Sequence, residues 1–493
     1  MRVTALKFSN INPSIGIFLV GTMGIFLGSI FSFVMNISLQ YTIILGTILI
    51  VSGLCLYTGK TKQILTTIML VTIPINVDKS LFLIEAHTGG VKGLVISIWS
   101  IALIILYFVW FFESWYGKER KTYSFPRITI PMGLLICISI LSILKSVNIS
   151  LSIFAIVQML NVFLLFFYIA NNVRSEKEYQ LIIFVLFAIF FFEIVLGYFQ
   201  YFMNKFVDLN IFSDVEKAST RELASRKIVT VSGTLTGDAR FGDYLSLMLF
   251  LVLGSVISKI KLYKRVIFIP MFAAGIMLLI FTFSRGAWIG FGSGLFLFLL
   301  LKMMFNLKNP RMYISLLLFV LIVLTVTFVF KDLIAERFYG EDYGSAESRI
   351  PMMQIGFEII KKNPLLGIGM NNYTRVMALY DPTGLSYVWH HPVHNVFIQL
   401  TAEIGIFGLI VFLWINTTVY VIGIKFIKNS NEFYQNQMTG LIAGITAVLV
   451  HGMVNNGTID TDPFILFWAL VGLIFAISKI NENIFIKGTR IIQ

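Results

Sequence analysis

The sequence predicts an all-α polytopic integral membrane protein, and two features of its composition support this fold class. Of its 493 residues, 57% are hydrophobic and 13% are charged, which is about half of the charged fraction of a soluble domain. The apolar residues also fall in runs of roughly 17–25, the length at which an α-helix crosses a bilayer. This composition excludes a disordered chain, a nucleic-acid-binding domain and a small secreted domain held by disulfides.

The apolar runs predict about 14 transmembrane helices, with about 12 as the lower bound. The first run is long and no small-residue cleavage site follows it, so we interpret it as a permanent span and not as a signal peptide. The expected spans are residues 13–35, 42–58, 64–77, 94–112, 129–144, 149–171, 180–203, 243–258, 266–283, 286–305, 313–330, 395–424, 436–454 and 463–479.

Lys and Arg are unevenly distributed among the loops between these spans, and this asymmetry predicts the orientation. If the N-terminus is cytoplasmic, one set of loops is strongly basic and the opposite set is close to neutral. An even number of spans separates the charges in this way. We therefore expect a multi-pass protein of the cytoplasmic membrane with both termini in the cytoplasm.

Two loops on the predicted outer side are long, residues 204–242 and 331–394, and long loops in compact proteins are usually functional or disordered. The second contains Trp, Tyr, His, Pro and Gly and has a helical pattern, which argues against disorder. The long loops divide the chain into four segments: residues 1–242, 243–330, 331–394 and 395–493.

The large loop is expected to bear amphipathic helices. From Ser348, a candidate N-cap, apolar residues recur at every third or fourth position, which is the period of an amphipathic helix resting on a membrane surface. These residues are Ile350, Met353, Phe357 and Ile360. The pattern ends at Asn363-Pro364, before a Gly-Ile-Gly turn.

Arg285, in Thr-Phe-Ser-Arg-Gly-Ala-Trp, is the first candidate for a functional residue because it lies between two apolar runs with almost no loop. One interpretation is a tight turn whose arginine extends to the lipid headgroups. The other is an arginine that holds a lipid phosphate with two parallel hydrogen bonds. A second candidate is Arg240, which follows a glycine-containing stretch in the first long loop.

Three of the five histidines, His390, His391 and His394, lie within five residues at the end of the large loop. A His-x-x-x-His spacing can bind zinc on a helix, but Pro392 lies inside it and disfavours a helical turn. A single neutral imidazole can act as a general base without a metal. His394, next to the following span, is the best placed for that role.

Two carboxylates, Glu193 and Glu403, lie within predicted spans, where a charge is costly and needs a partner. We interpret both as structural before catalytic. Gly405 and Gly408 are interpreted as small residues that let helices approach closely. The sequence contains no phosphate-binding or dinucleotide-binding glycine motif, so we expect no cofactor. No Cys, Asp or Glu stands near enough in sequence to the three histidines to complete a metal site, so we expect no metal.

Together these motifs resemble the O-antigen ligase and O-antigen polymerase superfamily of bacterial envelope enzymes. The ligases carry a His followed by Asn, Ser or Gln, then nine residues, then Gly-x-x-Gly, and His394-Asn395 with Gly405 and Gly408 fit that pattern. The stretches SRIPMMQIGFEIIKKNPLLGIGMNNY and FTFSRGAW also look like the family. The resemblance covers roughly residues 225–455.

The resemblance implies a metal-independent, inverting glycosyl transfer on the outer face of the cytoplasmic membrane, from a glycan on undecaprenyl diphosphate. It implies that Arg285 and Arg349 hold the diphosphate and that His394 activates the acceptor hydroxyl. Arg240 would be a third contact, although the stretch before it departs from the family wording. The substrate-binding residues implied by the resemblance are Arg240, Arg285, Arg349, His391 and Asn395.

Three functions remain open from the sequence. A polymerase would join lipid-linked repeat units of an O-antigen, capsule, exopolysaccharide or teichuronic-type glycan, and the span count favours it. A ligase would transfer a finished glycan to a lipid or protein acceptor. A transporter or flippase would place polar groups near the bilayer midplane, often in paired repeats, and no repeat is visible. Membrane lipid, a flippase and a chain-length regulator are partners implied by analogy, and no nucleic acid is expected.

Overall fold

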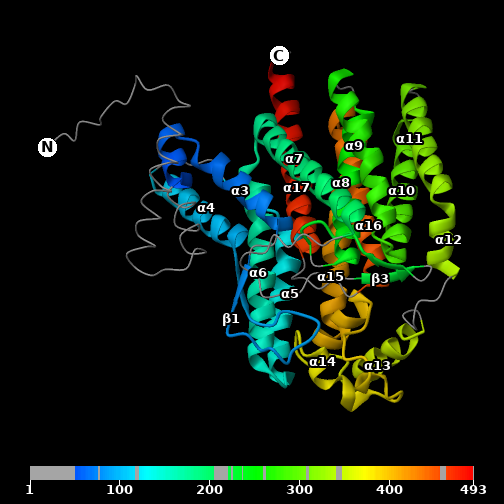
Figure 1. Cartoon of the computed structure of the whole chain (residues 1–493). Coiled ribbons are helices and arrows are strands. Elements are labelled where there is room, and N and C mark those ends of the chain that lie inside the picture. The colour runs from blue at the N-terminus through cyan, green and yellow to red at the C-terminus, as the bar shows by residue number, and fades with distance from the viewer. Residues whose placement is uncertain are drawn as a thin grey trace, which may run out of the picture.

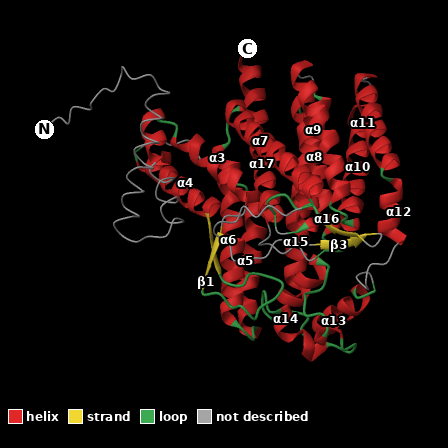
Figure 2. Ribbon diagram, in the orientation of Figure 1, coloured by secondary structure: helices red, strands yellow, loops and turns green. Residues whose placement is uncertain are grey.

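A computed structural model describes residues 50–75, 78–116, 122–204, 220–223, 226–235, 237–258, 262–306, 310–339, 347–455 and 462–491. Within these residues the protein is mostly helical, and Figures 1 and 2 show a bundle of long helices that run roughly alongside one another. Long apolar runs form helices in lipid because a helix satisfies its backbone N–H and C=O groups within the same segment.

The elements follow the chain in this order: α3 (Thr61–Ile75), β1 (Asp78–Leu81), β2 (Leu94–Ser97), α4 (Ile98–Trp115), α5 (Pro126–Ser142), η1 (Ile143–Lys145), α6 (Ile149–Asn172), α7 (Glu176–Met203), β3 (Thr220–Leu223), β4 (Arg226–Val229), α8 (Asp238–Ile257), α9 (Leu262–Phe281), α10 (Arg285–Asn306), α11 (Pro310–Val329), α12 (Lys331–Tyr339), α13 (Arg349–Lys362), α14 (Tyr373–Val376), η2 (Met377–Tyr380), η3 (Leu385–Tyr387), α15 (Val396–Asn429), α16 (Glu432–His451) and α17 (Asp462–Ile491).

Eight helices of the described part are long and apolar enough to cross a membrane: α4, α5, α6, α7, α8, α10, α15 and α17. Helices α3 and α9 are apolar but shorter, and α11 and α16 also form helices where spans were expected. The predicted span 13–35 and residues 42–49 of the predicted span 42–58 lie outside the described residues, whereas residues 50–58 are helical. The structure thus supports eight spanning helices, and the count of about 14 stays a prediction.

The mostly helical fold is as expected, but the sequence did not predict two short hairpins. Strand β1 pairs antiparallel with β2, and β3 pairs antiparallel with β4. Strand β2 takes the first four residues of the predicted span 94–112, so helix α4 begins only at Ile98. A four-residue strand that continues into an apolar helix has no periodicity of its own, so the sequence pattern does not separate the two.

Helices α8 and α17 form the centre of the bundle, and α4 and α5 lie at its edge. In the apolar windows of α8 and α17, 89% of the residues are buried, against 28% in α4. Figure 1 shows α13 and α14 at the lower end of the bundle, below α15, at the end opposite to the C-terminus. Helices α13 and α14 of the large loop therefore lie at one end of the bundle.

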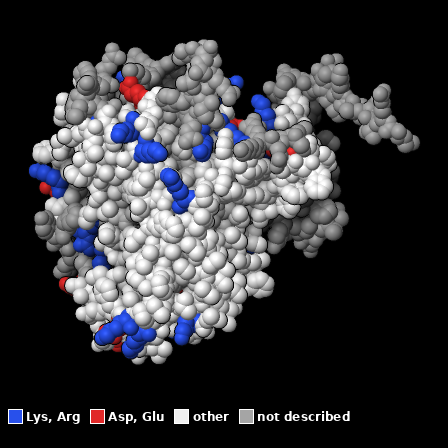
Figure 3. Space-filling view, turned by 180° about the vertical axis from the view of Figure 1, so that it is seen from behind, with Lys and Arg blue, Asp and Glu red and all other residues white. Residues whose placement is uncertain are grey.

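The surface of the protein has the apolar character of a membrane protein. Figure 3 shows a broad area without Lys or Arg, with basic residues gathered near the upper edge and a smaller group near the lower edge. Large apolar side chains on the outer helices are exposed, among them Phe108, Phe184 and Phe296. Such a band is what a bilayer covers, so the protein is an integral membrane protein.

Helix α13 forms where the pattern after Ser348 predicts an amphipathic helix. The side that packs on the protein is formed by Met352, Ile355 and Ile359, which are buried. Of the apolar positions named above, Ile350 and Phe357 are exposed. These two face away from the packed side, and their contact with a membrane surface stays a prediction.

Candidate functional site

Four residues that the sequence analysis singled out line one cavity of about 320 Å³. Arg240, Arg285, Arg349 and His394 come from four separate segments of the chain, and the fold brings them together. The other lining residues are Gly237, Asp238, Ala239, Ser284, Gly286, Arg337, His451, Val454 and Asn455. Four arginines and two histidines therefore face the cavity with one carboxylate, that of Asp238, which makes it suited to an anion.

The three predicted arginines stand at helix N-termini. Arg240 is in the first turn of α8, Arg285 is the first residue of α10, and Arg349 is the first residue of α13. The N-terminus of a helix carries a partial positive charge and N–H groups that have no partner within the helix. Backbone and guanidinium groups thus act in the same direction, as at known phosphate-binding helix ends.

The segment before α8 is anchored by buried polar groups of α7. The Glu193 carboxylate accepts a hydrogen bond from the Thr234 N–H at 3.0 Å. The Gln200 amide accepts from the Ser232 and Gly233 N–H groups, at 3.1 and 2.9 Å, and donates to the Gly233 carbonyl at 2.7 Å. Glu193 is thus structural, as expected, and holds the loop that leads into the first turn of α8.

A glycine is required within this loop. Gly233 has a φ of +58°, and a Cβ there would lie 2.2 Å from Glu193 Oε2. Any other residue would be strained at this φ and would push the carboxylate away. The Gly-Thr-Leu stretch, which departs from the family wording, is therefore fitted to the α7 carboxylate.

His394 lies immediately before α15, and Asn395 caps that helix. The side-chain Oδ1 of Asn395 accepts hydrogen bonds from the Phe397 and Ile398 N–H groups, both at 3.0 Å. Its amide nitrogen donates to the Met453 carbonyl at 3.0 Å, which ties the start of α15 to the end of α16. Asn395 does not line the cavity; it positions its neighbour, and its contact with a substrate stays a prediction.

The surroundings of His394 make it a neutral base. Its Nδ1 lies 3.3 Å from the Pro392 carbonyl oxygen. Because a carbonyl can only accept, Nδ1 carries the proton and Nε2 the lone pair. Burial, and then the charge of Arg349, lower the pKa of His394 to about 4, against the opposing effect of the Pro392 hydrogen bond. Near pH 7 the imidazole is uncharged and can accept a proton.

The three neighbouring histidines do not converge. His390 and His391 are exposed and neither lines the cavity. The His391 ring lies against Trp389, with centroids 5.0 Å apart. The partial burial of the ring lowers the pKa of His391. Among the described residues, no three His, Cys, Asp or Glu side chains lie close enough together to hold a metal ion. The substrate contact expected of His391 stays a prediction.

Two cavity residues were missed in the sequence. Arg337 of α12 donates from Nε to the Phe283 carbonyl at 3.0 Å, so α12 is attached to the turn before α10. His451 ends α16, and its Nδ1 lies 2.7 Å from an Asp243 carboxylate oxygen. Arg337 is one of several charges in a long loop, and His451 ends an apolar run, so nothing in the local pattern marks either of them.

Helix α10 packs closely against α16 and the residues that follow it at three glycines, which fixes the position of Arg285. A Cβ at Gly290 would lie 2.5 Å from the Ala447 carbonyl oxygen, and one at Gly294 would lie 2.6 Å from that of Ala443. A Cβ at Gly286 would lie 2.5 Å from the His451 ring. This glycine seam, Gly286, Gly290 and Gly294, brings the start of α10 to the end of α16.

Gly405 has a different role from the helix packing that the sequence suggested. It has a φ of +76° and breaks α15, and a turn after α13 approaches the break. The Ile406 N–H donates to the Pro364 carbonyl and the Gly369 N–H to the Glu403 carbonyl, both at 2.9 Å. The partner at Gly405 is thus a backbone turn and not a second helix.

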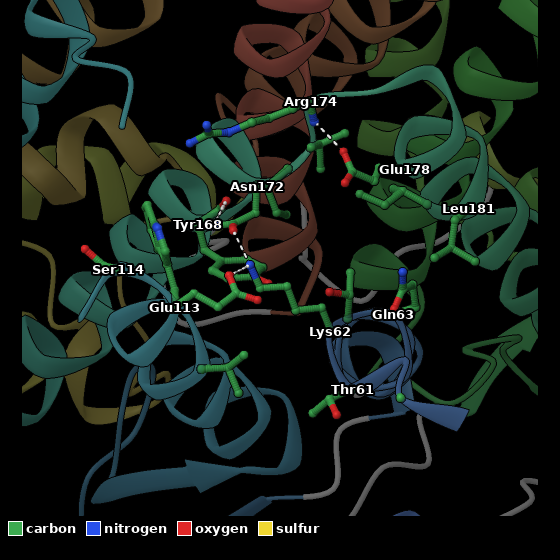
Figure 4. A pocket seen from close by; sticks show the side chains of 17 residues that line it. Thr61, Lys62, Gln63, Glu113, Ser114, Tyr168, Asn172, Arg174, Glu178 and Leu181 are labelled. Carbon is green, nitrogen blue, oxygen red and sulfur yellow. Dashed lines mark hydrogen bonds and ion pairs between the residues drawn. The ribbon is translucent and has the colours of Figure 1, made fainter. Parts of the chain in front are cut away.

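A second cavity of about 520 Å³ lies at the ends of α3, α4, α6 and α7 (Figure 4). Lys62 bonds to the Glu113 carboxylate and lies 3.5 Å from the Asn172 side-chain oxygen. The Arg174 N–H donates to the Glu178 carboxylate at 2.8 Å. The charged residues that line this second cavity are two basic and two acidic ones, so the cavity differs in charge balance from the arginine-lined cavity.

Residues 245–413 match the family described as O-antigen ligase. The chain thus carries the domain of the O-antigen ligase and polymerase superfamily, and the resemblance inferred from the motifs is confirmed. Proteins of this family carry out glycosyl transfer in membranes.

The other comparisons add no functional argument. No curated protein matches the chain. Among solved structures it is similar to a chain from a peptidoglycan synthase complex, with 12% identity and a TM-score of 0.36, over 71% of this chain and 96% of that chain.

Proposed function

We propose that the protein transfers a glycan from a lipid diphosphate carrier to an acceptor hydroxyl, with inversion at the anomeric carbon. The observation that carries the proposal is the gathering of Arg240, Arg285 and Arg349 at helix N-termini around one cavity that also contains His394. The guanidinium groups would bind the diphosphate, and the donor class fits their charge and geometry.

The proposed step needs one base and one stabilised leaving group. The acceptor hydroxyl oxygen forms a bond to the anomeric carbon, and its proton passes to Nε2 of His394. The bond between the anomeric carbon and the phosphate oxygen breaks, and its electron pair leaves with the diphosphate. The arginines stabilise that charge as it develops, which is the usual source of the largest rate effect.

We place this cavity on the outer face of the cytoplasmic membrane, with both termini in the cytoplasm. The support is the asymmetry of Lys and Arg among the loops. The second cavity, near Lys62 and Arg174, would then lie toward the cytoplasm. Labelling of single introduced cysteines at Lys361 and at Lys428 with a membrane-impermeant reagent tests this: the first should react in intact cells and the second should not.

The experiment that tests the reaction uses the purified full-length protein in lipid nanodiscs with an undecaprenyl-diphosphate-linked glycan. Arg285→Ala should lower the rate by about 100- to 1,000-fold, because it removes a charge that stabilises the transition state. The matched control is Lys361→Ala, which removes an exposed cation of α13 that does not line the cavity. An Arg285→Ala protein with the normal rate would contradict the proposal.

We propose polymerisation of repeat units of a cell-surface polysaccharide as the specific reaction, with the ligase activity as the alternative. The products separate the two: a polymerase gives a ladder of lipid-linked glycans of increasing length, and a ligase moves one glycan to a different acceptor. Movement of a labelled lipid-linked glycan across proteoliposomes without chain growth would favour a flippase.

A further inference from the structure

The cavity contains a second imidazole that the proposed reaction does not yet use. His451 is the last residue of α16 and its side chain is 3% exposed. Asp243 of α8, whose side chain is 10% exposed, lies behind it, with 2.7 Å between His451 Nδ1 and Asp243 Oδ1. A buried carboxylate beside a buried imidazole is costly unless the two are bonded. The pair therefore forms one unit.

The hydrogen bond fixes which nitrogen is available to a ligand. An ionised carboxylate can only accept, so Nδ1 of His451 donates to Asp243. The opposite edge of the ring faces the first turn of α10, since a Cβ at Gly286 would lie 2.5 Å from His451 Cδ2 and 2.7 Å from Nε2. Gly286, Arg285 and His451 all line the same cavity. Nε2 thus lies beside the guanidinium-bearing start of α10.

The two cavity histidines have opposite electrostatic partners. Nδ1 of His394 faces a neutral carbonyl, that of Pro392, and the nearby charge of Arg349 is positive. Nδ1 of His451 faces the carboxylate of Asp243. A carboxylate orients an imidazole and stabilises its protonated form, whereas a nearby cation disfavours that form.

We infer that His451, with both ring nitrogens protonated, binds the diphosphate of the lipid-linked donor through an Nε2–H hydrogen bond, and that Asp243 is the positioning residue whose carboxylate accepts the Nδ1–H and holds the ring in that form. This inference rests on the proposed function and adds a residue to the same site. His394 removes the acceptor proton, and His451 contacts the leaving group together with Arg285. The titratable and charged groups that share the cavity with His451 are Asp238, Arg240, Arg285, Arg337, Arg349 and His394.

The test measures binding of undecaprenyl diphosphate to the full-length protein in nanodiscs. His451→Ala should weaken binding roughly tenfold or more, the effect of losing a hydrogen bond to a charged group. His451→Gln, which retains an N–H donor, should recover part of the affinity. His390→Ala is the matched control, because His390 is exposed and does not line the cavity.

Asp243→Asn gives a readout that a structural role would not move. The Nε2–H donor exists only when both ring nitrogens carry a proton, and loss of the Asp243 charge disfavours that form, so the pH below which binding strengthens should be lower in Asp243→Asn than in the unchanged protein. Comparison of the two proteins with the same ligand at each pH removes the titration of the diphosphate itself. A shift supports the inference, and an unchanged pH profile overturns it.

The outcomes also separate this inference from the proposed function. Unchanged affinity in His451→Ala, with weakened binding in Arg285→Ala, overturns only the role of His451. Unchanged affinity in Arg285→Ala and Arg349→Ala as well overturns the assignment of the cavity to the diphosphate. If His451→Ala is not folded, as judged by gel filtration, the results of His451→Gln and Asp243→Asn decide.

Discussion

The two cavities of this protein differ in how their charges are balanced. In the larger one, Lys62 forms an ion pair with Glu113, the backbone N–H of Arg174 donates to Glu178, and the lining contains two basic and two acidic residues. In the smaller one, four arginines and two histidines face one carboxylate. The comparison teaches that the residues singled out from the sequence gather in the smaller cavity, where basic residues outnumber acidic ones, and not in the larger, balanced one.

The origin of the charges differs as well. In the larger cavity, the bonded pairs lie at helix ends. Lys62 at the start of α3 is bonded to Glu113 near the end of α4, and Arg174, two residues before α7, is bonded to Glu178 in the first turn of α7. In the smaller one, three N-termini carry an arginine each. The proposed diphosphate would meet three positively charged side chains and the partial positive charges of three helix N-termini at once.

The largest expected effect is at the base. His394→Ala should lower the rate of glycan transfer by roughly 100- to 10,000-fold, the usual contribution of a general base. The rate is measured with the purified protein and its lipid-linked substrate. His390→Ala, four residues away and outside the cavity, should keep the normal rate. Equal losses in both variants would mean that the cavity does not define the active site.

A smaller effect with a distinct signature is expected at Arg349, which should change the pH profile as well as the rate. The charge of Arg349 is one cause of the low pKa of His394. Arg349→Leu removes it, so the pKa of His394 should rise toward its ordinary value, and activity should be lost at a higher pH as the medium is acidified. The measurement is the residual rate between about pH 4 and pH 7. An acidic limb that does not move would separate Arg349 from His394.

The glycine seam gives a stability prediction with a control on the same helix. Gly290→Ala should destabilise the protein by about 1–3 kcal/mol, because its Cβ would overlap the Ala447 carbonyl. Gly292→Ala meets nothing within 4 Å and should be neutral or slightly stabilising. Thermal unfolding of the two variants in detergent measures the difference. Similar melting temperatures would show that α10 and α16 are not packed as described.

The smallest effect is expected in the balanced cavity. Lys62→Gln breaks a half-exposed ion pair with Glu113, and such pairs contribute at most about 1 kcal/mol. The transfer rate should change by no more than a few-fold. A loss as large as that of Arg285→Ala would break the comparison and assign a function to the larger cavity.

Much of the site could be predicted from the sequence because its residues interrupt regular patterns. Arg285 stands between two apolar runs and His394 stands where a span begins, so each is conspicuous locally. The rest depends on contacts across the fold. Asp243 and His451 are 208 positions apart, and each lies in a helix whose pattern is satisfied without the other. No periodicity reports such a pairing.

The fold was predictable to a similar degree. Apolar runs of spanning length located the long helices, because that pattern follows directly from burial in lipid. The hairpins and the break at Gly405 were not predictable. A positive φ inside an apolar helix costs energy locally and is stable only because Pro364 and Glu403 supply hydrogen-bond partners from elsewhere.

The glycine seam also has a mechanical consequence. Where the backbones of α10 and α16 are in contact, there is no free space for a larger side chain. A substitution of a glycine in this seam would therefore displace α10 and move its N-terminal end. Gly294 lies more than two turns from Arg285, yet a methyl group at Gly294 would tilt helix α10 and so move the guanidinium of Arg285. The position of Arg285 in the cavity is thus determined by packing within the bundle, at glycines such as Gly290 and Gly294 that do not line the cavity.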